Sequence, residues 1–297
     1  MKIQTLSIVV GSGSCDAHCK FCVSRMTGRE PGKAPEINWK RFDVACRLAE
    51  RAGCTAAMIT GKGEPTLFPE QVSEVISHLR NRFPLVELQT NGIRIARNRL
   101  IEAAKYAEGE EHDWVSCWVG NGLTTVGVSV VHYEKERNIE IYTPDTNWHF
   151  DLAELVKKLH GYGLSVRLCC VMLRGYIDNW ERVQEFIQFA KAQDVEQLTF
   201  TPVNMPAVSS DLAAERFTSS VILATSERKA IEFSLHEHQH IMTLPHGAKV
   251  FDVNGQNVCL NNCLSPQPSD MESLRNLIFM PDGHLYYKWD CEGAIII

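Results

Sequence analysis

The sequence lacks any apolar run long enough to cross a membrane. Its first segment, MKIQTLSIVV, has one positive charge and a short alternating apolar run, without a convincing signal-peptide cleavage site. Lysine and arginine form no basic stripe and the formal net charge is −6, so no extended nucleic-acid surface is expected. Low-complexity segments and long linkers are also missing. These absences predict a globular, cytoplasmic protein with no membrane partner.

Cysteine, by contrast, is plentiful, with eleven residues. Without an export signal we expect no disulfides, so clustered cysteines indicate metal or redox chemistry and isolated ones indicate core packing. Cys15, Cys19 and Cys22 lie within eight positions, and no fourth cysteine is nearby. Five others have no partner pattern and are predicted to lie in the core: Cys46, Cys54, Cys117, Cys169 and Cys170.

Short β-branched or apolar runs alternate with amphipathic stretches over the first two thirds of the chain. Strands are predicted at residues 3–10, 55–60, 85–90, 125–131, 164–173 and 197–203. Helices are predicted at residues 38–53, 69–83, 151–163 and 179–193, with Asn38 and Asp151 as N-caps. This order predicts an α/β fold with a parallel sheet and right-handed crossovers, specifically a partial (β/α)6 TIM-like barrel.

Two stretches depart from this alternation. Residues 106–124 are rich in glycine, acidic residues and tryptophan and are expected to form a loop. From about residue 205 the repeat ends: residues 204–217 can begin a helix, and Asn254-Gly255 between apolar residues predicts a hairpin. We therefore predict a barrel core at residues 1–204 and a C-terminal extension at residues 205–297.

The three-cysteine loop follows the first predicted strand, at the sheet edge where α/β proteins carry their active sites. Thiolates bind zinc or iron–sulfur clusters, and both usually take four ligands. A cubane cluster held by three cysteines leaves one iron open for an outside ligand. The alternatives are a zinc site completed by His18 or a distant residue, and thiols that only pack.

The loop resembles the cluster loop of the radical S-adenosylmethionine (SAM) superfamily, which reads Cys-x3-Cys-x2-Cys with an aromatic residue, here Phe21, before the last cysteine. The resemblance implies that these three cysteines hold a [4Fe-4S] cluster and that SAM completes the open iron. It also implies reductive cleavage of SAM to a 5′-deoxyadenosyl radical, which abstracts hydrogen from a substrate.

Two further strand ends fit the same superfamily. Residues 60–67, TGKGEPTL, resemble its Gly-Gly-Glu-Pro motif, whose backbone carbonyls receive the SAM amino group, although Lys62 here separates the glycines. The predicted SAM-binding residues of this turn are Gly61, Gly63, Glu64 and Pro65. An ordinary turn is the alternative. Residues 90–92, Thr-Asn-Gly, occur at the third strand end in many members and are expected to form a strand-end turn.

Polar residues on later strands complete the expected SAM site. A buried arginine requires an anion, because an unpaired charge is costly in the interior. By resemblance, Ser129 binds the ribose, Arg167 binds the carboxylate, and Thr201 with Pro202 lies nearest the adenine. The alternative for Arg167 is an outward-facing side chain paired with a helix glutamate.

Residues 171–203 resemble the branch that contains the GTP cyclase of molybdenum-cofactor synthesis and the peptide-modifying SPASM enzymes. That branch often carries a second cluster, so we predict a possible second [4Fe-4S] cluster on Cys259, Cys263 and Cys291. A zinc site or structural cysteines are the alternatives. His236, His238 and His240 would share a face on a strand, but a solvated histidine-rich surface is favoured.

The prediction is therefore a radical SAM enzyme acting on a small-molecule, nucleotide or peptide substrate, with an electron donor such as flavodoxin or ferredoxin. The cofactor supplies the difficult chemistry, while the protein excludes water and orients the substrate. The competing hypothesis is a non-catalytic zinc or iron–sulfur protein on an α/β barrel. The sequence names neither the substrate nor the fate of its radical.

Overall fold

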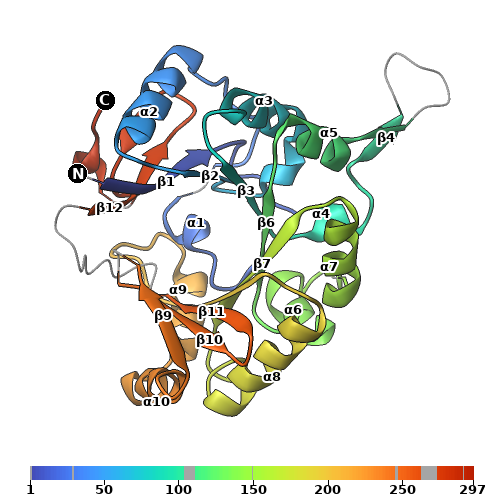
Figure 1. Ribbon diagram of the computed structural model, residues 1–297, viewed down its shortest axis with the longest axis vertical. Coiled ribbons are helices and arrows are strands. Elements are labelled where there is room, and N and C mark those ends of the chain that lie inside the picture. The colour runs from blue at the N-terminus through green and yellow to red at the C-terminus, as the bar shows by residue number, and fades with distance from the viewer. Residues whose placement is uncertain are drawn as a thin grey trace.

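A parallel β-sheet forms the centre of the molecule (Figure 1). The computed structural model describes residues 2–28, 30–103, 111–148, 150–244, 247–261, 273–289 and 291–297. Six parallel strands coincide with the six predicted from sequence: β1 (Lys2–Val9), β2 (Ala56–Thr60), β3 (Leu85–Thr90), β6 (Thr125–Val130), β7 (Ser165–Met172) and β8 (Gln197–Pro202). The predicted α/β fold of partial-barrel type is confirmed.

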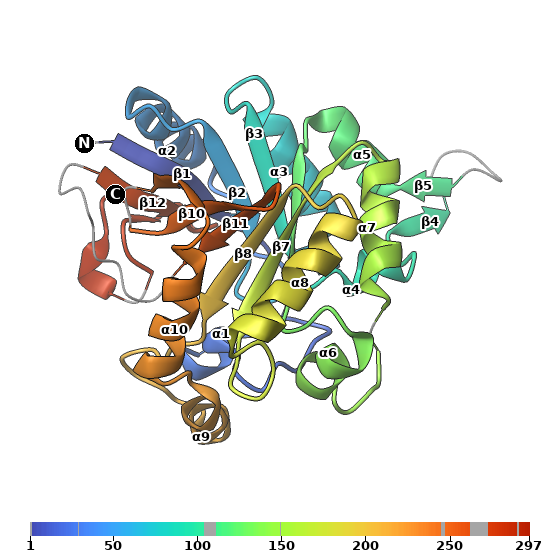
Figure 2. The same cartoon turned by 60° about the horizontal axis from the view of Figure 1, so that its bottom comes forward.

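Helices cover the outer face of this sheet (Figure 2). They are α2 (Trp39–Arg51), α3 (Pro69–Leu79), α4 (Ile93–Ala96), α5 (Trp114–Asn121), α6 (Lys135–Tyr142), α7 (Leu152–Gly161) and α8 (Trp180–Ala192). The predicted caps are confirmed, since the Asn38 side chain accepts from the backbone N–H of Arg41 and Asp151 accepts from that of Glu154. Each such bond satisfies one N–H that has no partner within the helix.

The two faces of each strand have different burial. Along β7 the even-numbered residues, such as Leu168 and Cys170, are fully buried under the helices. The odd-numbered residues, such as Arg167 and Cys169, are only partly buried on the inner face. Because side chains alternate along a strand, the core lies between sheet and helices while the inner face stays accessible.

The C-terminal extension adds strands to both edges of the same sheet. β11 (Gln256–Leu260) pairs parallel with β8, and β10 (Lys249–Val253) and β9 (Gln239–Thr243) follow antiparallel. At the other edge β12 (Ser273–Phe279) pairs parallel with β1, and β13 (Leu285–Tyr286) pairs antiparallel with β12. The described residues thus form an eleven-stranded sheet, and the domain division at residue 204 stays a prediction.

Two short local predictions in the extension are confirmed. Asn254 and Gly255 have positive φ angles of 53° and 88° and join β10 to β11 as an antiparallel hairpin. The helix expected to begin within residues 204–217 is α9 (Leu212–Val221), capped by Asp211, and α10 (Thr225–Leu235) follows it.

The prediction of a loop at residues 106–124 is wrong over residues 111–121, and residues 106–110 lie outside the described residues. A ribbon of β4 (Ile101–Ala103) and β5 (Glu111–Asp113) leads into α5. Asp113 caps α5 by accepting from the N–H of Val115, Trp118 is fully buried, and Gly122 ends the helix with a left-handed backbone. These start and stop signals were present in the sequence, but the surrounding glycines and acids obscured them.

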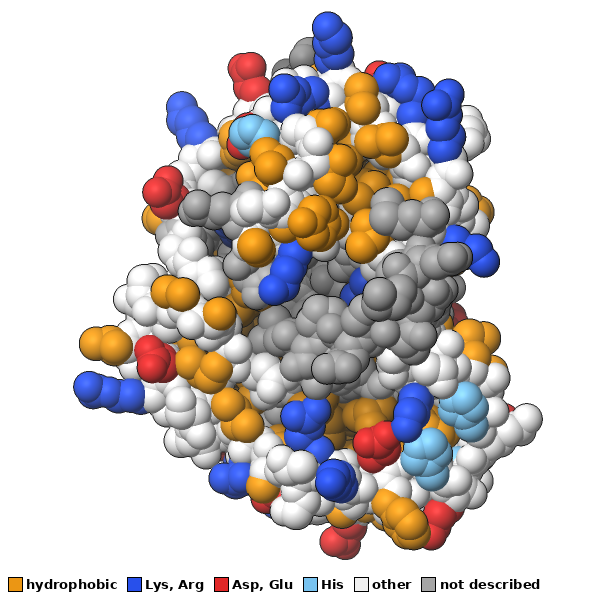
Figure 3. Space-filling model, turned by 90° about the vertical axis from the view of Figure 1, so that its left-hand side faces the viewer, with side chains coloured by type: hydrophobic (Ala, Val, Ile, Leu, Met, Phe, Trp, Pro, Cys, Tyr) orange, Lys and Arg blue, Asp and Glu red, His pale blue; other side chains and the backbone are white. Residues whose placement is uncertain are grey.

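The face of the molecule that carries the two sheet edges exposes side chains of several types. Figure 3 shows apolar, basic, acidic and histidine side chains interspersed there. Within the described residues, no helix is both long and apolar enough to span a membrane.

Candidate functional site

The three-cysteine loop lies between the carboxyl end of β1 and the short helix α1 (Val23–Met26), whose N-cap is Cys22. All three cysteines are partly buried, and none of the ten described cysteines forms a disulfide. Backbone N–H of Ala17 donates to Cys15 Sγ at 3.4 Å. Such a donor suits a thiolate, because it stabilises negative charge on sulfur. The donor set and its position therefore fit an iron–sulfur cluster.

A buried tyrosine from α6 contacts this loop through its backbone and its ring. Tyr142 is 3% exposed, and its backbone carbonyl accepts from the N–H of His18 at 2.7 Å. The Phe21 ring meets the Tyr142 ring edge-on, with centroids 6.1 Å apart. Burial holds the pKa of the Tyr142 hydroxyl well above its ordinary value. The aromatic residue of the cluster motif therefore anchors the loop by packing.

The glycine turn after β2 packs directly against the cysteine loop. A Cβ on Gly63 would lie 1.9 Å from the carbonyl oxygen of Ser14, and the N–H of Glu64 donates to that oxygen at 2.9 Å. A Cβ on Gly61 would lie 3.1 Å from the Val10 carbonyl oxygen. Only glycine permits the approach at position 63. Lys62 is exposed, so the departure from the usual Gly-Gly sequence is accommodated.

The Glu64 carboxylate ties this turn to the end of β3. Its Oε1 accepts from the hydroxyls of Thr66 and Thr90 at 2.7 and 2.6 Å. Its Oε2 accepts from the N–H of Asn91 at 2.9 Å. Burial raises the pKa of this carboxyl, while the hydrogen bonds oppose the rise. The side chain is thus used within the protein, and Pro65 begins the 3-10 turn Pro65–Leu67.

The inner face above the middle of the sheet carries a row of small polar side chains. Ser129, Cys169, Thr199 and Cys259 are consecutive partners across β6, β7, β8 and β11. Thr201 lies two residues further along β8 and is partly buried. Ser129 and Thr201 therefore share the face on which the sequence predicts SAM, although no contact places either on a ligand.

Arg167 lies on this inner face and forms an ion pair with Glu87 of β3. The two strands are separated by β6, where Gly127 leaves room: a Cβ there would lie 2.8 Å from Glu87 Oε1. The alternative of an outward-facing arginine paired with a helix glutamate is wrong, because the partner is a strand residue inside the barrel. Arg167 Nε is buried and has no hydrogen-bond partner among the described residues.

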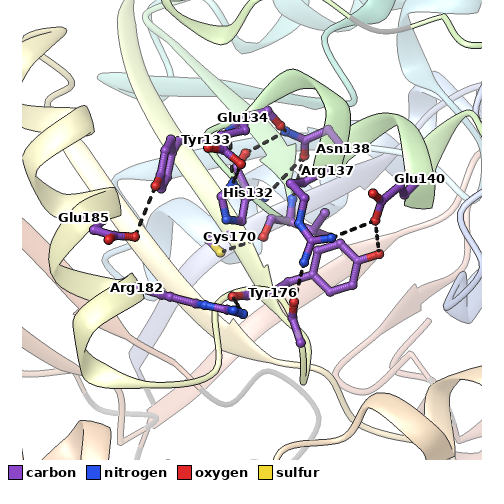
Figure 4. Close-up of polar contacts among 12 residues, drawn as sticks. His132, Tyr133, Glu134, Arg137, Asn138, Glu140, Cys170, Tyr176, Arg182 and Glu185 are labelled. Carbon is purple, nitrogen blue, oxygen red and sulfur yellow. Dashed lines mark hydrogen bonds and ion pairs between the residues drawn. The ribbon is translucent and has the colours of Figure 1, made fainter.

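A polar network connects the segment that follows β6 with α6 and with the segment that follows β7 (Figure 4). The fully buried Asn138 side chain accepts from Val131 N–H at 2.9 Å and donates to the His132 carbonyl at 2.6 Å. Arg137 donates to the Gly175 carbonyl and stacks over the Tyr176 ring at 4.3 Å. This network joins α6 to the segment after β7, and it was not anticipated from sequence.

The remaining predicted ligands are dispersed. The exposed His18 side chain pairs with Asp145 at 3.4 Å. Cys259 is partly buried on the inner face of β11, where burial raises its pKa to about 11, and Cys291 is exposed. Cys263 lies outside the described residues. The predicted core positions of Cys46, Cys54 and Cys170 are confirmed, whereas Cys117 and Cys169 are only partly buried.

The three histidines of residues 236–240 fall on different elements. His236 caps the end of α10, His238 lies in the following turn against Trp180, and His240 is on β9. Among the described side chains, no three histidine, cysteine or acidic groups converge on one metal ion. Ligands of a cubane bind different irons, so they do not need to converge in that way.

The chain belongs to the radical SAM superfamily. The family model with that description matches residues 9–190, more than half of the chain. Members of this superfamily are enzymes that use a [4Fe-4S] cluster and SAM, which favours an enzyme over the hypothesis of a non-catalytic binding protein. Comparison with curated proteins finds no match.

Solved structures share the fold at low sequence identity. SuiB of Streptococcus suis bound to SAM has a TM-score of 0.60 and 16% identity over 97% of this chain and 60% of its own. The anSMEcpe structure with bound AdoMet has a TM-score of 0.59 and 14% identity over 99% and 74%. A radical SAM methyltransferase from Sphaerobacter thermophilus has a TM-score of 0.52 and 14% identity over 87% and 66%. The chain thus spans 60% of the length of SuiB.

Replacing Gly63 by alanine is expected to disrupt the contact between the glycine turn and the cysteine loop. The new methyl group overlaps the Ser14 backbone oxygen, so we expect a loss of about 1–3 kcal/mol in unfolding free energy. Urea denaturation measures this loss. Gly120→Ala is the control, because nothing lies within 4 Å of its Cβ and alanine favours helix α5. Equal stability of the two variants would contradict the contact.

Removing one partner of the Arg167–Glu87 pair is expected to cost about 3 kcal/mol, the lower end for a buried pair. The side chains remain 23% and 18% exposed, which limits the penalty. Chemical denaturation of Arg167→Met, Glu87→Gln and the double variant measures the coupling, and the double variant should lose less than the sum. Arg174→Met, from the exposed pair with Glu227, should cost under about 1 kcal/mol. If the loss in unfolding free energy of the double variant equalled the sum of the two single losses, the two side chains would not be energetically coupled.

Proposed function

We propose that Cys15, Cys19 and Cys22 bind the catalytic [4Fe-4S] cluster and that the adjoining turns bind SAM against it. The observation that carries this proposal is the direct packing of the glycine turn on the cysteine loop, with Gly63 against Ser14 and the N–H of Glu64 bonded to its carbonyl. A ligand that touches both turns would therefore sit at one place on the carboxyl edge of the sheet.

Each predicted residue has a role consistent with its position. Gly61, Gly63, Glu64 and Pro65 present backbone groups at the strand end, since the Glu64 side chain is already used. Ser129 is proposed to bind the ribose, and Thr201 to lie near the adenine. Arg167 keeps Glu87 as its counter-charge, and its unpartnered Nε remains available to the SAM carboxylate.

When bound, the cluster and SAM supply an electron and a carbon radical that takes a hydrogen atom from the substrate. The role of the protein is to hold the cluster and SAM and to shield the site from water. Tyr142 packs on Phe21 of the cysteine loop, and the start of α9 contacts α1, the helix that follows this loop. There, Arg25 of α1 pairs with Asp211 at 2.7 Å, and Met26 carbonyl accepts from Ser210 N–H at 2.7 Å. Excluding water protects a reactive intermediate from side reactions.

The substrate proposal is a small molecule, nucleotide or peptide, with an electron donor such as flavodoxin or ferredoxin. The branch of the molybdenum-cofactor GTP cyclase and the SPASM enzymes remains our proposal for the nearest relatives, supported by the sequence of residues 171–203. A second cluster on Cys259, Cys263 and Cys291 belongs to the same proposal. Hydrogen transfer from labelled SAM to candidate compounds would identify the substrate.

Replacing any one of Cys15, Cys19 or Cys22 by alanine is expected to abolish reductive cleavage of SAM. Each cysteine would supply one of only three protein ligands, so its loss leaves two irons unligated by protein. Chromatographic detection of 5′-deoxyadenosine after reduction measures cleavage. Cys117→Ala is the control, because that partly buried cysteine lies on α5, away from the loop in sequence. Retained cleavage in a loop variant would contradict the assignment.

Iron and sulfide content of anaerobically purified protein distinguishes one cluster from two. About four irons per chain supports the catalytic cluster alone, and about eight supports the second cluster as well. If the second cluster is present, Cys291→Ala should lower the iron count from about eight to about four per chain. Reductive cleavage of SAM at the first cluster should continue in this variant. Zinc in place of iron would reject both proposals.

A further inference from the structure

The side chain of Asn91 bridges the end of β3 and the cysteine loop. Asn91 is 7% exposed, and its Nδ2 donates to Asp16 Oδ1 at 2.8 Å. The same Nδ2 lies 4.0 Å from Cys15 Sγ, within the range of a hydrogen bond to sulfur. An amide nitrogen carries two hydrogens, so one can point to each acceptor.

The orientation of this amide follows from its other end. The Oδ1 atom of Asn91 accepts from the N–H of Ile93 at 3.0 Å, at the start of α4. Because the oxygen is committed to that donor, the nitrogen must be the atom that faces the cysteine loop. The backbone N–H of Asn91 is bonded to Glu64 Oε2, which holds the residue from its other side. Hydrogen bonds therefore hold both ends of the Asn91 side chain as well as its backbone.

A donor beside a cluster sulfur affects the reduction potential. Reduction adds negative charge that is spread over iron and sulfur, and hydrogen bonds to the sulfurs stabilise the reduced form. Residues outside the ligand shell orient and tune the ligands in this way. Asp16 places a carboxylate next to the same cysteine, and Asn91 binds that carboxylate as well as facing the sulfur. Loss of the amide would remove both effects.

We propose that Asn91 is a positioning residue that raises the reduction potential of the cluster, by donating to Cys15 Sγ and by offsetting the negative charge of Asp16 with a hydrogen bond. This inference rests on the proposed function, since it requires the cluster on Cys15, Cys19 and Cys22. It assigns a role to the Thr-Asn-Gly turn beyond ending a strand. It also links the proposed SAM-binding turn to the cluster ligand Cys15, because Glu64 of that turn accepts from the Asn91 N–H and the Asn91 side chain faces Cys15.

The test is an anaerobic potentiometric titration of Asn91→Ser, followed by the EPR signal of the reduced cluster. Serine keeps a short oxygen that can accept from the Ile93 N–H, and it adds no charge, but it lacks the amide donor. We expect the ratio of reduced to oxidised cluster at a fixed potential to fall about tenfold, which is a shift of about 59 mV for a one-electron couple.

Asn91→Asp is the second variant, because it retains the Oδ1 acceptor for Ile93 while replacing the donor by an anion. We expect a larger fall than in Asn91→Ser, since the added carboxylate faces Asp16 and Cys15. Asn254→Asp is the matched control. It makes the same change in the hairpin before β11, at the opposite edge of the sheet from the cysteine loop, and should leave the midpoint unchanged.

The outcomes separate this inference from the proposed function. Wild-type protein without a reducible cluster would overturn the proposed function, and with it this inference. Normal iron content in the wild type, with an unchanged midpoint in whichever Asn91 variant holds its cluster, would overturn the inference alone. A lowered midpoint at equal iron content and equal melting temperature supports it, because a structural role would move stability and not potential.

Discussion

The buried carboxylate of Glu64 is the contact on which the candidate site depends. It accepts from Thr66, Thr90 and Asn91, and so joins the turn after β2 to the turn after β3. A carboxylate removed from water is costly unless its oxygens are bonded, and here both are. The same turn packs on the cysteine loop through Gly63. The segments that follow β1, β2 and β3 are therefore held in fixed positions relative to one another.

The second organising feature is the difference between the two faces of the sheet. Apolar side chains facing the helices form the core, and polar side chains on the inner face are left for a site. The Arg167–Glu87 pair lies in the middle of this inner face, with Gly127 providing its space. An ion pair in that position gives the barrel interior fixed charges without net charge. Polar ligands can bind there without an unpaired protein charge.

The extension is part of the same architecture. β11 and β12 continue the parallel sheet at its two edges, and α9 contacts α1 next to the cysteine loop through the Arg25–Asp211 pair. Segments far apart in the chain thus enclose the carboxyl edge. The likeness to longer structures such as SuiB concerns this fold, and the substrate chemistry of this chain remains a proposal.

Periodicity and local motifs were sufficient to predict the six parallel strands, four helices, the Asn254-Gly255 hairpin and the superfamily, because these depend on neighbouring residues in the chain. The helix α5 was missed, although Asp113 and Gly122 marked its ends. The partner of Arg167, the bridge from Asn91 to Asp16 and Cys15, and the pairing of the extension with β1 and β8 were decided by tertiary structure alone. The physical reason is that such contacts join residues tens to hundreds of positions apart, and only the register of the assembled sheet brings them within bonding distance.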